Sequence, residues 1–396
     1  MVSGLLDAGM LVDGDSAGTL DNMDDKVEQG YLTLNGCAQT PSWVEHRNRS
    51  RSTKVLSHNW MSYLEDDTLL SAMTIPGTHD SAAYTVSLPF VATQKMNIVQ
   101  QLDAGIRYFD FRCGVRSNQV EMVHGATYLG LKFEDVLNDM YEWLDTHTSE
   151  ALIIQIKRDR KEKKSNVDFA NAIFQVLAKR SEFWRTADTT PTIGELRGRI
   201  QLFRRFVEPE LHEYGIDVSE WQDNPRDPFT LYTCSGVQLT IQDHYAFPQA
   251  TTLPSVIAKK GGNIAELLDR ASSDNAAHNW YINFTSAFEI NVLYQIPPRE
   301  IAVGGWWLFR WKHGVNPRLR QTLKQAQGQR RRLGVVAMDF PEQGAEDLVS
   351  ALYMTNFDSG SGYTTSRWLI LLTIMLVLSS LVAIYEQQHI RQLYTG

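Results

Sequence analysis

The stretch SAMTIPGTHDS, residues 71–81, joins a short apolar run to a histidine and an aspartate. Such runs, closed by turn residues, are typical of buried strands. Helical patterns at 133–146, 167–179 and 317–327 alternate with strand-like runs. The strand-like runs are 71–77, 107–113, 120–125, 152–157, 200–206, 239–245, 281–287 and 334–340. This alternation predicts an α/β fold, a (βα)8 TIM-like parallel barrel of regular or irregular form.

Polar side chains stand at or just beyond the carboxyl ends of seven of these runs. They are His79, Arg112, His124, Lys157, Arg205, Asp243 and Asp339. A single polar residue in this place commonly just begins a turn. Seven of them predict a shared site, because the carboxyl ends of barrel strands meet on one face. Two histidines, three cations and carboxylates suit phosphodiester cleavage, which needs a base, an acid and fixed positive charge.

Composition excludes several other classes of protein. The chain carries 38 Lys and Arg against 46 Asp and Glu, a net charge of −8, which disfavours a nucleic-acid partner. Three cysteines are too few and too scattered for a disulfide framework or a zinc site, and a reducing compartment fits them better. No phosphate-binding glycine loop, G-x-S-x-G elbow or H-E-x-x-H helix is present. No carboxylate or histidine spacing suits a catalytic metal, so we expect none.

The two ends of the chain differ from its middle. Residues 1–36 hold seven acids and one lysine, which predicts a disordered tail, and nothing in residues 1–10 resembles a secretory signal. A short basic stretch, 47–54, reads as a solvated linker or as a lipid-headgroup contact. Residues 368–385 are eighteen residues without charge, about the length that crosses a bilayer.

We therefore expect a C-terminal transmembrane helix and a single-pass membrane protein whose catalytic domain faces the cytosol. A buried core helix and a lipid-attachment signal are the alternatives for this segment. The predicted organisation lists an acidic tail and basic linker (1–55), a catalytic barrel (56–345), a linker (346–367), the transmembrane helix (368–385) and a polar tail (386–396).

Four motifs in order make a family resemblance specific. They are TIPGTHDSAAY (74–84), AGIRYFDFRCG (104–114), VHGATYLGLKFEDVL (123–137) and SEALIIQIK (149–157). This order resembles the X domain of phosphatidylinositol-specific phospholipase C, most closely the small bacterial type. The likeness continues through weaker motifs and covers most of 56–341. GTHDS followed by HG some 45 residues later is its strongest signal.

The resemblance implies roles for particular residues. His79 matches the general base that takes the proton of the inositol 2-hydroxyl, and Asp339 the carboxylate that orients it. His124 matches the general acid for the diacylglycerol oxygen, with Asp80 as its partner. Arg112 matches the arginine that neutralises the phosphate. The resemblance also implies residues that line the inositol pocket: Lys157, Arg205, Asp243 and Tyr245.

The implied substrate is phosphatidylinositol or a related inositol phospholipid. The implied products are diacylglycerol and inositol 1,2-cyclic phosphate. Calcium-dependent members of the superfamily have an asparagine after the first histidine and acidic ligands near the second strand. This chain has Asp80 and Arg112 in those places. A guanidinium supplies permanent charge, so we expect no cofactor and no calcium.

One stretch outside the motifs is rich in tryptophan. Trp306, Trp307 and Trp311 predict either packing beneath a long loop or a contact with the bilayer interface. Two other functions stay open on sequence alone: a non-catalytic lipid-binding scaffold of the same fold, and a barrel phosphodiesterase for a different head group. Both histidines favour the enzyme over the scaffold, and the missing carboxylate cluster disfavours the metal-dependent phosphodiesterases.

Overall fold

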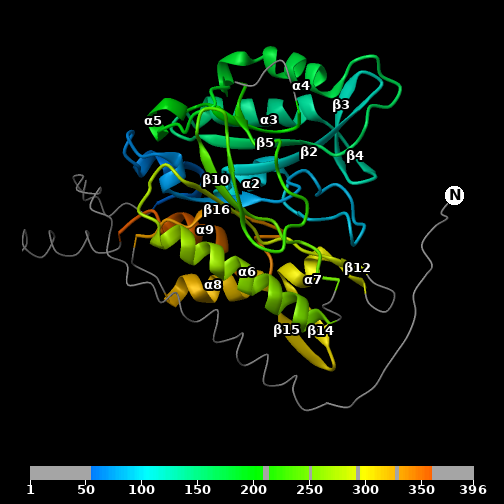
Figure 1. Cartoon of the computed structure of the whole chain (residues 1–396), viewed down its shortest axis with the longest axis vertical. Helices are drawn as coiled ribbons and strands as arrows, with labels where there is room; N and C mark the ends of the chain where they lie inside the picture. The colour runs from blue at the N-terminus through cyan, green and yellow to red at the C-terminus, as the bar shows by residue number, and fades with distance from the viewer. Residues whose placement is uncertain (1–54, 208–213, 249–251, 291–294, 326–329, 359–396) are drawn as a thin grey trace, which may run out of the picture.

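The computed structural model describes residues 55–207, 214–248, 252–290, 295–325 and 330–358. A twelve-stranded sheet runs through these residues, and helices α3 (Phe133–Thr146) and α6 (Leu253–Ser273) pack on the same face of it, through the Phe111–Phe133 and Asn283–Ile264 contacts. In Figure 1, α3 and α4 (Phe169–Ala178) lie above β5 (Leu152–Arg158), and α6, α8 (Val315–Gln325) and α9 (Leu348–Met354) lie below β16 (Gly334–Met338). The main path across the sheet, in order, is β6 (Trp184–Arg185), β7 (Ile200–Arg205), β5 (Leu152–Arg158), β2 (Tyr108–Arg116), β1 (Thr74–Thr78), β16 (Gly334–Met338), β11 (Trp280–Phe284), β10 (Gln238–Gln242) and β9 (Phe229–Tyr232).

The remaining elements are shorter strands, helices and turns of 3-10 helix. The other strands are β3 (Gln119–His124), β4 (Thr127–Lys132), β8 (Ile216–Asp217), β12 (Glu289–Ile290), β13 (Gln295–Ile296), β14 (Gly304–Trp307) and β15 (Arg310–His313). The helices are α2 (Ile98–Ala104), α3 (Phe133–Thr146), α4 (Phe169–Ala178), α5 (Ile193–Leu196), α6 (Leu253–Ser273), α7 (Pro298–Ala302), α8 (Val315–Gln325) and α9 (Leu348–Met354). The 3-10 turns are η1 (Ser57–Tyr63), η2 (Leu70–Ala72) and η3 (Ser181–Phe183).

The predicted (βα)8 barrel is wrong in its closure, and of the two forms that the sequence left open the structure has the irregular one. Strands β6 to β10 on the main path are all parallel, but β9 pairs antiparallel with β10, and the path ends there. No pairing among the described strands joins β9 to β6, so the sheet is an open, mixed half-barrel. The physical reason is the segment between β7 and β10, which supplies short strands where a regular barrel would have a strand and helix.

One predicted barrel strand is part of a hairpin. Strand β3 pairs antiparallel with β2, because only Ser117 and Asn118 join the two strands. Both residues have left-handed backbones, with φ 51° and 61°, as a two-residue hairpin turn requires. A parallel crossover needs about a dozen residues. A two-residue link can therefore only reverse the chain.

Local sequence explains where the helices begin. Asn97 and Gln100 form a reciprocal capping box at the start of α2, and Thr252 and Ser255 form one at the start of α6. Helix α3 turns its apolar face, including Phe133 and Leu137, into the core. Helix α9 lies at residues that the sequence assigned to a linker, and it packs on α8 and β1. The other domain limits stay a prediction, and residues 1–54 lie outside the described ranges.

The predicted membrane anchor is contradicted by the helices that the structure describes. Among them, none is long and apolar enough to cross a bilayer. The longest, α6, contains charged residues such as Glu266 and Arg270 on its exposed side. Residues 368–385, on which the prediction rested, and the tail 386–396 lie outside the described residues. The predicted single-pass membrane location, with the catalytic domain facing the cytosol, rested on this anchor and is wrong for the same reason.

Candidate active site

His79 and Asp339 meet because their strands are parallel neighbours. Strand β1 ends at Thr78, which pairs with Met338 at the end of β16, so the next residue of each strand lies side by side. His79 Nδ1 is 2.8 Å from Asp339 Oδ1. Arg112 Nη2 lies 2.9 Å from the other ring nitrogen, Nε2. A guanidinium only donates, so Nε2 accepts and the ring proton is on Nδ1, facing the carboxylate.

Burial sets the charge states of this pair. It lowers the pKa of His79 well below its ordinary value, and the charges of Arg112 and His124 lower it further. Burial raises the pKa of Asp339 well above its ordinary value, and the neighbouring Asp80 adds to that rise. The imidazole is therefore neutral near pH 7 and has its Nε2 lone pair on the side of Arg112, which is the form that a general base needs.

His124 arrives from the β2–β3 hairpin. The register pairs Cys113 with Met122, so the end of β3 returns beside Arg112. His124 Nδ1 is 2.7 Å from the carbonyl oxygen of Val91, which can only accept, so Nδ1 carries a proton. Nε2 lies 3.2 Å from Asp80 Oδ2. The two histidine rings are 6.4 Å apart and nearly perpendicular.

Asp80 lies between the two histidines and the arginine. Its Oδ1 is 2.9 Å from Arg112 Nε, and its Oδ2 is 3.4 Å from His79 Nε2. Burial raises the pKa of Asp80 to about 6, although Arg112 and His124 act in the opposite direction. Its backbone is left-handed, φ 42°, a conformation that costs a non-glycine residue about 1 kcal/mol or more. This backbone conformation places the carboxylate at the centre of the group, where its contacts with Arg112 and His124 hold it.

Arg112 is surrounded by carboxylates. Besides Asp80, it lies 3.4 Å from Asp110 Oδ2 and 4.0 Å from Asp159 Oδ2. Burial opposes its charge, but these three carboxylates together hold the pKa of Arg112 well above its ordinary value. Asp110 shares its face because alternate residues of a strand point the same way. The guanidinium is thus charged at every accessible pH.

A second group of the predicted residues follows the neighbouring strands. Lys157 Nζ is 2.9 Å from Asp159 Oδ1. Arg205 lies 3.4 Å from Asp243 Oδ2 and stacks 4.1 Å from the ring of Trp221. Tyr245 donates its hydroxyl proton to Asp223 Oδ1 at 2.8 Å. Burial and this carboxylate raise the pKa of Tyr245 to about 12, so the phenol is neutral.

Phe284 connects the two groups. Its ring lies 5.9 Å from His79 on one side and 5.7 Å from Trp221 on the other. The indole Nε1 of Trp221 donates to Asp243 Oδ2 at 2.9 Å. The structure therefore places all nine predicted site residues at the same edge of the sheet.

Several residues of this edge escaped the sequence analysis. Asp110 and Asp159 each stand two residues from a predicted cation, and that spacing is a usable signal for them. Trp221 and Asp223 lie in a long loop without a local pattern. Gln94 donates to the carbonyl oxygens of His79 and Met338, both at 2.8 Å, and so ties the ends of β1 and β16 together.

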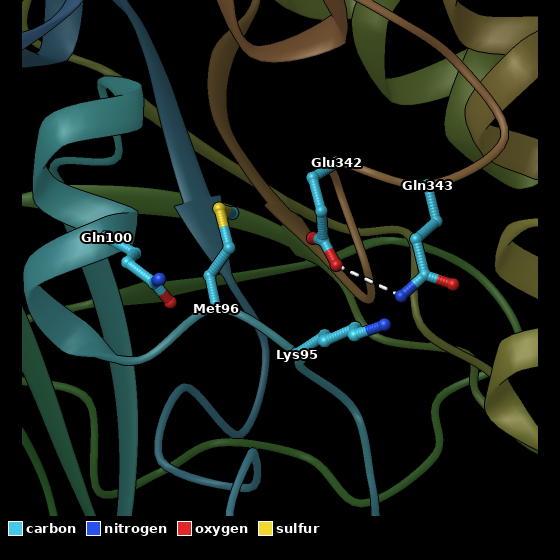
Figure 2. A pocket seen from close by; sticks show the side chains of 5 residues that line it. All are labelled: Lys95, Met96, Gln100, Glu342 and Gln343. Carbon is cyan, nitrogen blue, oxygen red and sulfur yellow. Dashed lines mark hydrogen bonds between the residues drawn. The ribbon is translucent and has the colours of Figure 1, made fainter.

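The loop before α2 also borders a cavity. Figure 2 shows this space, of about 540 Å³, between Lys95, Met96 and Gln100 on one side and Glu342 and Gln343 on the other. Gln343 Nε2 donates to Glu342 Oε1 at 3.0 Å across its edge (Figure 2). None of the nine predicted site residues lines it. Within the described ranges, no three His, Cys, Asp or Glu side chains are grouped to hold a metal ion.

Residues 73–206 match the family model described as phosphatidylinositol-specific phospholipase C, X domain. A 1-phosphatidylinositol phosphodiesterase of Staphylococcus aureus is 26% identical over 333 residues, 79% of this chain and 99% of that protein. The enzyme of the same name from Listeria monocytogenes is 26% identical over 316 residues, which cover 75% of this chain and 85% of that protein.

Solved structures show the same fold. A phosphatidylinositol-specific phospholipase C from S. aureus aligns with a TM-score of 0.65 and 24% identity, covering 76% of this chain and 98% of that one. The phosphatidylinositol-specific phospholipase C of L. monocytogenes aligns with a TM-score of 0.57 and 24% identity, covering 76% of this chain and 100% of that one. Together with two histidines and an arginine at the carboxyl edge of the sheet, these matches define a phospholipase C-like phosphodiesterase. Residues 73–206 of this chain belong to the phosphatidylinositol-specific phospholipase C X-domain family.

Proposed function

We propose that this chain cleaves phosphatidylinositol, or a related inositol phospholipid, between phosphorus and the diacylglycerol oxygen. The observation that carries the proposal is the His79–Asp339 pair, with Nδ1 protonated toward the carboxylate and Nε2 accepting on the side of Arg112. His79 takes the proton of the inositol 2-hydroxyl, whose oxygen attacks the phosphorus held next to it. The products are inositol 1,2-cyclic phosphate and diacylglycerol.

The leaving oxygen needs a proton in the same reaction. In the proposed mechanism, His124 supplies it from Nε2, and the carboxylate of Asp80, 3.2 Å away, stabilises the protonated ring. Arg112 stabilises the charge that develops on the phosphate oxygens. The inositol hydroxyls are bound by Lys157, Arg205, Asp243 and Tyr245. Asp159 holds Lys157, and Trp221 holds both Arg205 and Asp243.

We propose that the reaction needs no calcium. The support is Arg112, whose charge is fixed by three carboxylates and lies beside the base and, through Asp80, beside the acid. This charge does the work that a bound cation would do, and it is present without any added ion.

The test uses the purified full-length chain with phosphatidylinositol in mixed micelles and excess EDTA. Phosphorus NMR should show inositol 1,2-cyclic phosphate as the first product. No cyclic product, or activity that appears only when calcium is added, would overturn the mechanism. His79→Ala and His124→Ala should each lower turnover by about 10³-fold or more. The exposed His278→Ala, at the opposite end of β11, is the matched control and should leave turnover unchanged.

We also propose that the β14–β15 hairpin contacts the lipid surface. Leu308 and Phe309 form its two-residue turn, are 75% and 98% exposed, and have left-handed backbones, φ 44° and 65°. Glycine and asparagine normally fill such positions, so the turn is strained in order to expose apolar side chains. Trp306 and Trp311 pair across the strands below the tip.

Sedimentation with phosphatidylcholine vesicles tests this contact. The double substitution L308N/F309G relieves the turn and removes its apolar surface, so vesicle binding should fall by about tenfold or more while soluble short-chain substrate is still cleaved. Unchanged binding would reject the hairpin as a lipid contact.

A further inference from the structure

A buried lysine stands behind the site and has no place in the mechanism above. Lys260 lies in the middle of α6 and is 0% exposed, whereas its neighbour Lys259 points to solvent. In the part of the chain that the structure describes, no carboxylate forms an ion pair with Lys260. Burial of a lone ammonium costs several kcal/mol, so an apolar residue would be the cheaper choice at this position for stability alone.

The ammonium group binds both sides of one residue of the inositol group. Its Nζ donates to the side-chain oxygen of Gln242 at 3.1 Å and to the backbone oxygen of His244 at 2.7 Å. These residues flank Asp243 at the carboxyl end of β10. The backbone N–H of His244 also donates to the Gln242 oxygen, at 2.9 Å. Lys260 therefore closes a small ring of hydrogen bonds around the backbone of Asp243.

The same ring is tied to the next strand and back to the helix. Gln242 Nε2 donates to Asn283 Oδ1 and to the carbonyl oxygen of Phe284, both at 2.8 Å. Asn283 in turn donates to the carbonyl oxygen of Ile264 on α6, at 2.9 Å. With its amide nitrogen committed to β11, Gln242 presents its oxygen to Lys260 and cannot flip.

Lys260 also acts on the catalytic pair through its charge. Asp339 Oδ2 is buried and has no hydrogen-bond partner among the described residues. Burial and Asp80 raise the pKa of Asp339, and Lys260 is the strongest of the cations that act in the opposite direction. The same cation lowers the pKa of His79. Both effects favour an ionised carboxylate beside a neutral imidazole.

We propose that Lys260 is a positioning residue of this phosphodiesterase site, holding Asp243 in place through the end of β10. This inference rests on the proposed function. Lys260 touches no substrate atom in it, since its hydrogen bonds go to the backbone and amide groups beneath the pocket.

The charge of Lys260 gives the pH dependence a direction. Burial lowers the pKa of Lys260 to about 7, against the attraction of Asp243 and Asp339. The charged and titratable groups around it are Asp243 and His244 after β10, Asp339 after β16 and His79 after β1. Below pH 7 the cation is present, and above pH 7 it is progressively lost. Its effect on His79 is therefore greatest in acid.

The test compares Lys260→Met with the wild type, because methionine keeps the volume and removes the charge. We expect KM to rise by about tenfold, as Asp243 loses its support, with a smaller fall in kcat. The acid limb of kcat/KM should move to higher pH, because the pKa of His79 rises without the cation. The part of the difference that comes from the charge of Lys260 should shrink as pH rises through 7, while the rise in KM that comes from the lost hydrogen bonds remains.

Histidine NMR gives a readout that does not depend on activity. The pKa of His79 should be higher in Lys260→Met, and Lys259→Met, the same change on the exposed side of α6, should leave it unchanged. The melting temperature of Lys260→Met at pH 6 should not fall below that of the wild type, because a costly buried charge has been removed.

Two results would overturn the inference. One is a Lys260→Met variant with wild-type KM and an unshifted His79 titration. The other is a loss of stability with no change in either, which would make the lysine merely structural. An inactive wild type with the expected His79 shift would refute the proposed function and leave the placement of Lys260 behind His79 intact.

Discussion

One arginine stands just before strand β2 and another stands at its middle, and the two arginines are held in opposite ways. Arg107, just before the strand, is 0% exposed and donates to Glu150 from Nε and Nη2, at 3.0 and 2.8 Å. Its remaining donors go to the carbonyl oxygens of Leu102, Ile106, Ser57 and His58. The ring of Trp143 lies 4.7 Å from its guanidinium carbon.

Arg112, five residues further along the chain and within β2, has a looser set of partners. One contact, to Asp80, is 2.9 Å long, while those to Asp110 and Asp159 are 3.4 and 4.0 Å. Its Nη2 also lies on the ring nitrogen of His79, 2.9 Å away. Carboxylates with longer contacts hold a cation in place and still allow a phosphate to bind it. Arg107, whose hydrogen-bond donors all have close protein partners, stabilises the fold. Arg112, whose partners are fewer and more distant, is available to a ligand.

The largest expected effect comes from changing the looser arginine. Arg112→Lys keeps one positive charge but loses the planar fork that reaches the carboxylates, His79 and a phosphate together. We expect kcat/KM to fall by about 10³-fold with little change in melting temperature. Steady-state kinetics and calorimetry measure both. A variant that melts far lower, or that keeps most of its activity, would erase the contrast with Arg107.

The next effect is on stability. Arg107→Met leaves Glu150 as an uncompensated buried charge, which should lower the free energy of unfolding by about 3–5 kcal/mol. Turnover per folded molecule should be unchanged. Urea unfolding with activity measured at low urea separates the two quantities. The double variant R107M/E150Q should recover part of the loss. A fall in turnover without loss of stability would show that the two arginines are coupled.

The smallest expected effect is a shift in pH dependence from Asp80→Asn. Burial raises the pKa of Asp80 from 3.8 to about 6, so the folded state holds this proton more tightly than the unfolded chain. The folded protein therefore loses stability as pH rises from 3.8 to about 6. Asn has no proton to lose, so its melting temperature relative to the wild type should rise across that window by a few degrees, while turnover falls. Calorimetry across this pH range checks the prediction. Melting temperatures that change in parallel with pH in the two proteins would contradict it.

Much of the fold follows from local pattern in the sequence. The helix predicted at 133–146 is α3 with the same bounds, because its apolar spacing matches one helix face. Residues 152–157 form most of β5, an apolar run that is buried on both faces. The polar residues after such strands share an edge, because parallel strands end on the same side.

The rest depends on long-range geometry that a local pattern does not contain. Whether the sheet closes depends on the pairing of β9 and β6, which are far apart in sequence. Helix α6 escaped the analysis because Gly261 and Gly262 interrupt its pattern, and Lys260 stands where an apolar residue is expected. Trp221 joins the site from a loop, and no periodicity marks it.

The turn at Ser117 and Asn118 makes the site sensitive to the length of the chain as well as to its residues. His124 reaches Arg112 only through the register of the hairpin, in which Cys113 faces Met122. A one-residue slip turns every side chain of a strand to its other face. The loss or gain of one codon between 113 and 122 would therefore remove His124, the proposed acid, from the site while leaving every proposed catalytic residue encoded. Surveys of related chains should accordingly find substitutions in this turn far more often than insertions or deletions.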